Sequence, residues 1–405
     1  ASLVGSEMCI RDSYNIMLRD SIEKAYNTHS PNLMRFAQQI ASPALIYDVD
    51  QLVLIASILT RELSAFEIHF AVKASYNPTI LKTLARMLDG CDVSGQYEYR
   101  LAKSAGFKKI TSTSPYYSAD DMNFFSDSGI ILDLNSVEQI ELFKKTVSTN
   151  DIGLRIKIPI KDTYETTGAG SRFGLCINDD ELHHILSSSN LIVKRLHAHT
   201  GQLNKARAIY VFRYLLALSE YFCSVETIIL GGGITHIFRN SSPRIEKEFS
   251  DLVHVINQWR SINNRPLQVI LEPGDALVSP CGYLVSTVIS VFFNTNDEQC
   301  IIVDSSAWNI APWGTPVVKF VGAEKNERVP TIIYGCSCYE EDRYIKHDEI
   351  TNRKELFYLP HLKAGDRIIM APFGGYTMTN IRHFNGIAAP KEYYIINNLI
   401  LDNSH

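Results

Sequence analysis

One lysine stands where a nucleophilic amine could take part in chemistry. Lys73 ends the alternating apolar stretch IHFAVK and precedes Asn77-Pro78, after which the pattern becomes that of an amphipathic helix. This order predicts that Lys73 lies at the carboxyl end of a strand, which in a parallel α/β barrel faces the active site. Loss of hydration there favours the neutral amine that attacks carbonyl groups. From this stretch alone, both a Schiff-base lysine and a lysine that merely reaches water remain open.

A carboxylate and a run of glycines follow later predicted strands. Glu272, in ILEPGD, could hold a proton on a ligand nitrogen or could cap the backbone amides of a turn. The triple glycine after TIIL consists of Gly231, Gly232 and Gly233. Its backbone N–H groups are free of side chains, as a phosphate site requires, although a flexible turn would have the same composition.

Two histidines, His197 and His199 in RLHAHTGQ, are two residues apart on a predicted strand and therefore share one face. The same spacing occurs in metal-binding barrels, which need further histidine and aspartate ligands on other strands. Here the strand after TIIL supplies Glu272 instead. A metal site is therefore the weaker of the two interpretations.

The elements that must position these residues follow a regular order. Strand patterns occur at IHFAVK, CDVS, KITSTS, IILDL, GLRIKI, RLHAHT, TIILGG and QVILEP, with a helical stretch after almost every one. Eight strands alternating with helices predict a (β/α)₈ barrel over residues 44–278. Residues 279–405 are rich in β-type segments and predict a C-terminal antiparallel β domain. We expect residues 14–43 to pack on that domain.

Composition restricts the remaining possibilities. The 405 residues are 45% hydrophobic and carry a net charge of −5, with no long basic run for nucleic acid or an anionic membrane. No apolar segment approaches the ~20 residues that cross a bilayer. Eight cysteines, without paired metal-type spacing apart from Cys336 and Cys338, favour a reduced, cytoplasmic protein. Residues 1–13 resemble neither a signal nor a transit peptide, and we interpret them as a non-native leader.

The lysine stretch resembles a known family. FAVKASYNP, followed by CDVSGQYEYRLAKSAGF, is similar to the signature of the fold-type III decarboxylases that use pyridoxal phosphate, typified by ornithine and diaminopimelate decarboxylases. The similarity recurs from about residue 43 to the C-terminus. It implies that Lys73 binds the cofactor covalently, that Glu272 pairs with the pyridine nitrogen and that the triple glycine binds the phosphate.

The resemblance extends to the ring-stacking histidine and its neighbours. His199 matches the family histidine that lies on the cofactor ring, although Gln202 replaces a usual serine three residues later. Asp92 and Arg155 resemble the acid and base that orient this histidine. For both residues, a structural ion pair near the barrel is the alternative.

The C-terminal half contains a second set of family motifs. GCSCYEED resembles a segment that the family delivers across a dimer interface, in which Cys338 would return a proton to the substrate carbon. Asp342 would support it as an acid and contact the substrate. Tyr376, in FGGYT, resembles a tyrosine that touches the phosphate. The resemblance thus implies a homodimer with shared active sites.

The positions that set specificity depart from the best-known members. Tyr339 replaces an aspartate of ornithine enzymes or a glutamate of diaminopimelate enzymes, while Asp275 and Pro312 replace two arginines. Loss of these cations argues against a distal carboxylate, which would be buried without a partner. Asp275 could meet a distal amine. Trp308, Trp313 and Tyr339 would offer a stacking surface.

These observations predict a cytoplasmic, homodimeric decarboxylase that uses pyridoxal phosphate and acts on a modified or larger amino acid rather than diaminopimelate. An amino-acid racemase of the same fold is one alternative, and product analysis would separate the two. A catalytically inactive homologue that binds a protein, like the antizyme inhibitors, is another. Retention of Lys73, Glu272 and Cys338 argues against the inactive homologue.

Overall fold

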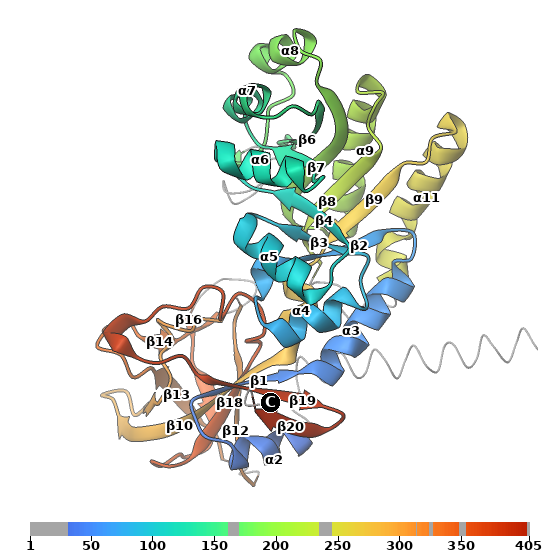
Figure 1. The fold of residues 1–405 in the computed structure, drawn as a ribbon. Helices are drawn as coiled ribbons and strands as arrows, with labels where there is room; N and C mark the ends of the chain where they lie inside the picture. The colour runs from blue at the N-terminus through green and yellow to red at the C-terminus, as the bar shows by residue number, and fades with distance from the viewer. Residues whose placement is uncertain are drawn as a thin grey trace, which may run out of the picture. The chain divides into compact units, whose positions relative to one another are not determined.

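The chain forms two compact units. The computed structural model describes residues 31–160, 170–234, 245–312, 314–323, 327–347 and 354–402. The barrel unit comprises Ala56–Ala276, and the sheet unit comprises Ala1–Ile55 with Leu277–His405 (Figure 1). The expected leader, residues 1–13, lies outside the described residues. In the described parts of the chain, no helix is both long and apolar enough to cross a membrane.

The barrel unit confirms the predicted closed sheet of eight parallel strands. These are β2 (Glu67–Ala71), β3 (Gly90–Val93), β4 (Lys109–Thr113), β5 (Leu132–Leu134), β6 (Asp151–Arg155), β7 (Ile192–Gln202), β8 (Thr227–Gly233) and β9 (Gln268–Glu272). Each pairs with the next in sequence, and β9 pairs with β2 to close the ring. All eight correspond to the strands expected from hydrophobic alternation. Their carboxyl ends therefore converge on one mouth of the barrel.

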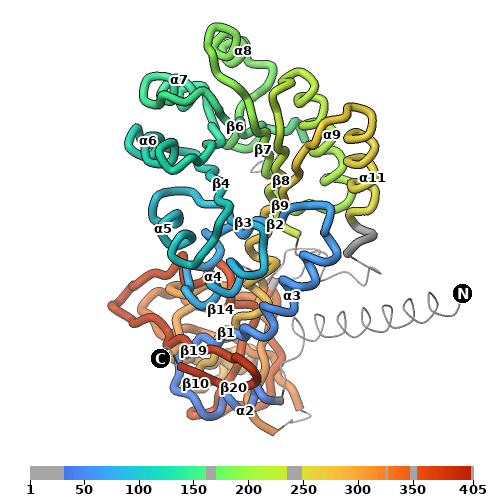
Figure 2. The backbone as a smooth tube through the Cα atoms, turned by 45° about the vertical axis from the view of Figure 1, so that its right-hand side comes forward, coloured from blue at the N-terminus to red at the C-terminus, as the bar shows by residue number. Residues whose placement is uncertain are grey.

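Helices surround these strands. They are α4 (Pro78–Ala85), α5 (Gln96–Ala105), α6 (Ala119–Asp127), α7 (Val137–Thr146), α8 (Asp180–Ser187), α9 (Lys205–Tyr221) and α11 (Ile245–Asn263). Helices α9 and α11 lie side by side outside the barrel (Figure 2). Local signals fix the ends of the helix that follows the lysine. Asn77 caps α4 by accepting the backbone N–H groups of Thr79 and Ile80, and Pro78 occupies its first turn.

The sheet unit contains a mixed sheet rather than the purely antiparallel one that we expected. Its strands are β1 (Ala44–Asp48), β10 (Gly282–Phe293), β11 (Gln299–Val303), β12 (Val317–Phe320), β13 (Val329–Tyr334), β14 (Arg343–Tyr344), β17 (Phe357–Leu359), β18 (Arg367–Ala371), β19 (Lys391–Ile396) and β20 (Leu399–Asp402). Most pairs are antiparallel, but β1 with β19 and β11 with β13 run parallel. The short strands β15 (Lys346–His347) and β16 (Lys354–Glu355) form a separate pair.

The expected start of the barrel at residue 44 is wrong. Strand β1 pairs with β10 and β19 in the sheet unit, whereas the barrel begins with β2. The physical reason is that β2 and β9 already close the barrel, so that it has no free edge for a ninth strand. Helix α3 (Val49–Glu62) connects β1 to the barrel strands.

Helix α2 (Pro31–Gln39) packs on the sheet of its own unit. Its apolar side chains Leu33 and Phe36 join a buried cluster with residues of β1, β10, β18 and β19. Arg367 of β18 donates hydrogen bonds to the backbone oxygens of Ala37 and Ile40, at 2.7 and 2.6 Å. This contact satisfies carbonyl groups at the carboxyl end of α2 that have no partner within the helix.

Candidate active site

A cavity of about 310 Å³ lies in the barrel unit, at the carboxyl ends of its strands. Five of the predicted site residues line it, from four strands and the turn after β2. Its lining consists of Lys73, Asp92, Ser94, Thr113, Pro115, Arg155, Ser171, Phe173, His197, His199, Gly201 and Glu272. The barrel topology therefore brings together side chains that are up to two hundred positions apart in the sequence.

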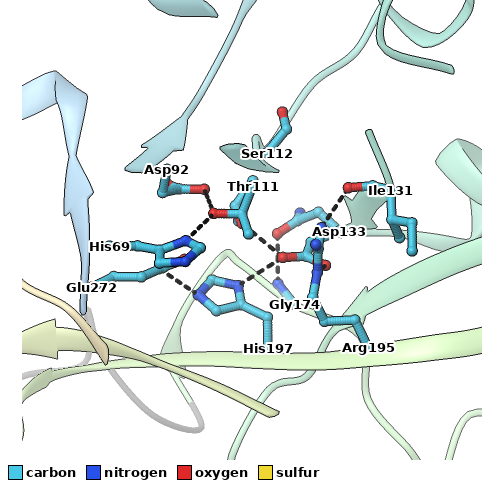
Figure 3. Close-up of polar contacts among 12 residues, drawn as sticks. His69, Asp92, Thr111, Ser112, Ile131, Asp133, Gly174, Arg195, His197 and Glu272 are labelled. Carbon is cyan, nitrogen blue, oxygen red and sulfur yellow. Dashed lines mark hydrogen bonds and ion pairs between the residues drawn. The ribbon is translucent and has the colours of Figure 1, made fainter. Parts of the chain in front are cut away.

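Lys73 reaches this cavity from a short 3₁₀ turn, η1 (Val72–Ala74), immediately after β2. Its Nζ lies 3.8 Å from Oδ2 of Asp92, and the lysine side chain is 41% exposed while that of the aspartate is 1% exposed. Thr111 donates a hydrogen bond to the other oxygen of Asp92, at 3.4 Å (Figure 3). Burial and the charge of Glu272 raise the pKa of Asp92 well above its usual value, and Lys73 partly opposes them. The amine is thus held near a carboxylate yet remains accessible.

Glu272 ends β9 with its carboxylate buried among charged groups. Its Oε2 lies 3.4 Å from Nε2 of His197, which is an ion-pair distance longer than an ordinary hydrogen bond. Burial raises the pKa of Glu272, but His197 and Lys73 offset this effect and bring it to about 2. Its Oε1 is buried and has no hydrogen-bond partner among the described residues. A charged oxygen is therefore available to a ligand.

His199 and Arg155 occupy the same wall of the cavity. Desolvation by the surrounding atoms, together with the positive charges of Lys73 and Arg155, lowers the pKa of His199, so its imidazole is neutral near pH 7 although the residue is exposed to the cavity. The Arg155 guanidinium lies over the ring of Phe173, 4.6 Å from the centroid. Burial lowers the pKa of Arg155, and the carboxylates of Glu272 and Asp92 oppose this shift. Arg155 thus acts on His199 through its charge, while its guanidinium lies over Phe173.

The triple glycine forms the last three residues of β8, where the surrounding atoms leave no space for side chains. A Cβ on Gly231 would lie 2.8 Å from Nε2 of His197, and one on Gly233 would overlap the Gln202 side chain. Gly232 has φ +143°, a conformation that L side chains rarely adopt. The absence of side chains therefore allows His197, His199 and Glu272 to approach the backbone of Gly231 closely. Gln202, found where the family has serine, packs against this backbone.

Our sequence analysis missed a charged pair inside the barrel. Nε of Arg195 donates to Oδ1 of Asp133 at 2.7 Å, and the side chains are 9% and 0% exposed. Thr113 donates to the second oxygen of Asp133 at 2.9 Å, and Arg195 also donates to the backbone oxygen of Ile131 (Figure 3). A signal did exist, because an aspartate between two leucines on β5 must face opposite to them. Its partner, 62 residues away, has no such local signal.

In the sheet unit, the loop that carries Cys338 is organised by Asp342. This aspartate is 2% exposed, and its carboxylate accepts the backbone N–H groups of Trp308 and Ser337, both at 2.9 Å. The backbone N–H of Cys338 donates to Oδ1 of Asn385 at 2.8 Å, and the Cys338 side chain is exposed. The Asp342 carboxylate thus holds its own loop to the segment that carries Trp308.

Next to Cys338, two aromatic rings form an exposed surface. The rings of Tyr339 and Trp308 lie 4.4 Å apart and are 38% and 37% exposed as residues. The guanidinium of Arg382 lies over Trp308 at 4.0 Å and donates to its backbone oxygen at 3.2 Å. Arg382 was not among our predicted residues, because nothing in the sequence ties it to a tryptophan 74 positions earlier. The surface thus combines aromatic faces with one cation.

Three other predicted residues have separate positions. Tyr376 is half-buried in the sheet unit with φ 59°, a left-handed conformation that is strained for tyrosine. Asp275 begins the short helix α12 (Asp275–Val278) and does not line the barrel cavity. Trp313 lies outside the described residues.

The barrel site fits pyridoxal phosphate on three independent observations. A buried carboxylate oxygen of Glu272 lacks a partner among the described residues, as pairing with a ring nitrogen requires. The Lys73 amine reaches the cavity, and the side-chain-free backbone of Gly231 lies in register between His199 on β7 and Glu272 on β9, two residues that line the cavity. Among the described residues, no group of three or more His, Cys, Asp or Glu side chains is placed so that it could hold a metal ion.

Comparisons with known proteins agree with this assignment. The family model of the pyridoxal-dependent decarboxylases, pyridoxal binding domain, matches residues 51–279. The carboxynorspermidine/carboxyspermidine decarboxylase of Campylobacter jejuni is 24% identical over 383 residues, covering 88% of this chain and 93% of that protein. The diaminopimelate decarboxylase of Zymomonas mobilis is 25% identical over 302 residues, covering 68% and 70%.

Solved structures have the same fold. The diaminopimelate decarboxylase of M. jannaschii in complex with L-lysine superimposes with a TM-score of 0.76 at 20% identity, covering 91% of this chain and 90% of that one. The expected barrel with a C-terminal β domain is therefore confirmed at the level of the fold. Because the family model covers more than half of the sequence, the chain belongs to the fold-type III decarboxylases and is an amino-acid decarboxylase that uses pyridoxal phosphate.

Proposed function

We propose that the chain decarboxylates the α-carboxylate of an amino-acid derivative with a long chain and a distal amine, of the carboxylated-polyamine class. The observation that carries this proposal is the surface beside Cys338, where Tyr339 packs on Trp308 instead of presenting a carboxylate. Aromatic faces bind methylene chains and cationic amines. The full-length similarity to a carboxynorspermidine/carboxyspermidine decarboxylase supports the same class.

Asp275 supports a distal amine for an electrostatic reason. It replaces an arginine that the family resemblance leads us to expect, and Pro312 replaces a second one. A substrate with a free distal carboxylate would lose both cationic partners. Arg382 is the one described cation beside Trp308, and a substrate that used it would need a distal anion. Diaminopimelate is therefore the informative competitor in a substrate screen.

The barrel residues have separate proposed roles toward the cofactor. Pyridoxal phosphate, when bound, supplies a ring that accepts the electron pair released as carbon dioxide leaves. The Lys73 amine would bind it covalently until the substrate amine takes its place. Glu272 would hold a proton on the ring nitrogen, and its low pKa keeps it charged for that task. The neutral imidazole of His199 would lie on the ring face.

Phosphate binding is proposed for Gly231, Gly232 and Gly233, with Tyr376 contributing from the sheet unit. Asp92, close to Lys73, and Arg155 would balance charge around these groups. Neither of these two residues is proposed to react.

Proton return to the α-carbon is proposed for Cys338, with Lys73 as the other candidate. The family resemblance places this cysteine at a dimer interface, so we propose a homodimer whose partner subunit supplies it. Asp342 would act by holding the loop, because its oxygens accept backbone N–H groups. Cys338→Ala should lower kcat about 10²-fold while cofactor remains bound. Unchanged turnover, with Cys336→Ala as the matched control, would remove Cys338 from the mechanism.

A cytoplasmic location is also part of the proposal. The seven cysteines among the described residues are all free, as in proteins from reducing compartments.

A substrate screen tests the proposal directly. Carbon dioxide release would be measured with carboxynorspermidine, carboxyspermidine, diaminopimelate, ornithine and lysine. We expect kcat/KM to be highest for the carboxylated polyamines, and Asp275→Asn to raise KM for these substrates more than for ornithine. Preference for diaminopimelate would overturn the proposed substrate class and would implicate Arg382. Retention of the carboxylate with inversion of the α-carbon would instead identify a racemase.

A further inference from the structure

His197 occupies a position between two buried carboxylates. Its Nε2 lies 3.4 Å from Oε2 of Glu272, and its Nδ1 lies 4.0 Å from Oδ2 of Asp133. Figure 3 shows the imidazole lying between these two side chains, one from β9 and one from β5. All three are buried, with 2% of His197, 7% of Glu272 and 0% of Asp133 exposed. Water therefore contributes little to the solvation of these groups.

Neither ring nitrogen has another partner. Both are buried without a hydrogen bond among the described residues, so the two carboxylates are the groups available to them. The arrangement thus places the imidazole between two carboxylates in a low-dielectric interior, where ionic pairing outweighs the loss of hydration only with good geometry.

Asp133 is itself fixed in place. Its Oδ1 accepts from Nε of Arg195 at 2.7 Å, and its Oδ2 accepts from Thr113 at 2.9 Å. These contacts connect β4, β5 and β7 below the cavity. The chain of contacts then runs from Arg195 through Asp133 and His197 to Glu272, the residue at the cavity.

We propose that His197 is a positioning residue that keeps the Glu272 carboxylate ionised and oriented toward the cofactor, and that the Asp133–Arg195 pair holds His197 in place. It acts through Glu272 and does not touch the reacting atoms. The proposal concerns cofactor binding, so it stands whether or not the proposed substrate class is correct.

Other ionisable groups surround this pair and must be considered. The charged or titratable side chains around Glu272 and His197 are His69 on β2, Lys73 after it, Asp92 on β3, Asp133 on β5, Arg155 on β6, and Arg195 and His199 on β7. Lys73 also favours the charged form of Glu272, but it is the residue that binds the cofactor. His197 is therefore the permanent neighbour of the carboxylate.

The test compares cofactor binding by the wild type and His197→Gln at two pH values. Without His197, burial of Glu272 dominates and its carboxylate takes up a proton at a higher pH than in the wild type. We expect the ratio of the two Kd values for pyridoxal phosphate to grow as pH falls from about 8 to about 6, by up to about tenfold per pH unit. The covalent bond between Lys73 and the cofactor also depends on pH. Dividing the Kd of the variant by the Kd of the wild type at the same pH removes this shared dependence.

A merely structural role predicts a different result. If His197 only filled space, His197→Gln would weaken binding by the same factor at both pH values, and this outcome would overturn the proposal. His69→Gln is the matched control, because it removes a second buried barrel histidine whose imidazole faces Glu67 and Thr111 and which lowers the pKa of Glu272 less than His197 does. Its Kd ratio should change with pH by a clearly smaller factor than that of His197→Gln.

Two further variants keep the test decisive. If His197→Gln does not fold, His197→Asn offers the same comparison with a shorter amide. Asp133→Asn leaves His197 present but removes one of its two carboxylates, and its Kd ratio should also grow as pH falls, by a smaller factor than that of His197→Gln. A Kd ratio that is the same at both pH values would exclude Asp133 from the arrangement.

Discussion

The interior of the barrel and the core of the sheet unit differ in the kind of side chain that they bury. Around α2, the sheet unit buries a cluster made wholly of apolar residues, including Phe36, Ile46 and Ile369. Inside the barrel, Asp133, Arg195 and His197 are buried with Glu272. An apolar cluster gains stability from the area removed from water, whereas buried ions require partners at fixed distances. The first core tolerates small changes in shape, and the second depends on every member.

The largest expected effect separates activity from stability. Lys73→Ala should lower decarboxylation by about 10³-fold or more, because no other described amine lines the cavity. It should also abolish the cofactor label that borohydride reduction fixes on the chain, as peptide mapping would detect. The midpoint of denaturant unfolding should not fall. Lys109→Ala, which removes an exposed barrel lysine paired with Glu67, is the control and should retain the label.

Removal of one buried charge should be the most damaging change to stability. Asp133→Ala leaves Arg195 buried without its carboxylate, and we expect the free energy of unfolding to fall by about 3–5 kcal/mol. The double variant Asp133→Leu/Arg195→Met should recover much of this loss, because neither charge then remains. Urea unfolding of the cofactor-free proteins measures both. Additive effects of the two substitutions would contradict the comparison with the apolar core.

A matched deletion in the apolar core should cost less. Ile369 is fully buried on β18, and Ile369→Val removes one methylene group without exposing a polar atom. We expect a loss of about 0.5–1.5 kcal/mol in the free energy of unfolding. The pH dependence of cofactor binding should remain that of the wild type. A change in that pH dependence would show that the two cores are not independent.

The last expected effect is a change of slope in acid. The pKa of Glu272 is about 2 in the folded chain against 4.5 ordinarily, so its ionised form stabilises the fold above pH 4.5. This contribution is lost as pH falls from 4.5 toward 2. Glu272→Gln lacks it, and its thermal unfolding midpoint should therefore fall less steeply below pH 4.5 than that of the wild type. Parallel curves would show that the carboxylate is not stabilised by its neighbours.

Much of the fold could be predicted because strands and glycines leave local signals. All eight barrel strands, Lys73 and the triple glycine are recognisable from alternation and turn residues. The placement of β1 in the sheet unit could not be predicted, because its pairing with β10 joins residues more than two hundred positions apart. Strand β12 was also missed. Unlike the equally short barrel strands β3 and β5, it is not part of a regular alternation of strands and helices that would reveal it.

The site was less predictable than the fold. Family motifs located Glu272 and His199, but the contact between Tyr339 and Trp308 depends on the path of a loop. The pair of Asp133 and Arg195 depends on the register of barrel closure, which short stretches of sequence do not specify. Long-range polar contacts are the part of a barrel that periodicity does not reveal.

Gly153 on β6 gives the buried charges a further consequence. A Cβ there would overlap the Asp133 carboxylate and lie 3.3 Å from Nε of Arg195. The volume that a side chain at position 153 would need is already occupied by its neighbour's charge. The residues at positions 133 and 153 therefore constrain each other during evolution. An alanine at position 153 fits only after the carboxylate at position 133 has been replaced by a smaller side chain, so the two substitutions are tolerated in one order only.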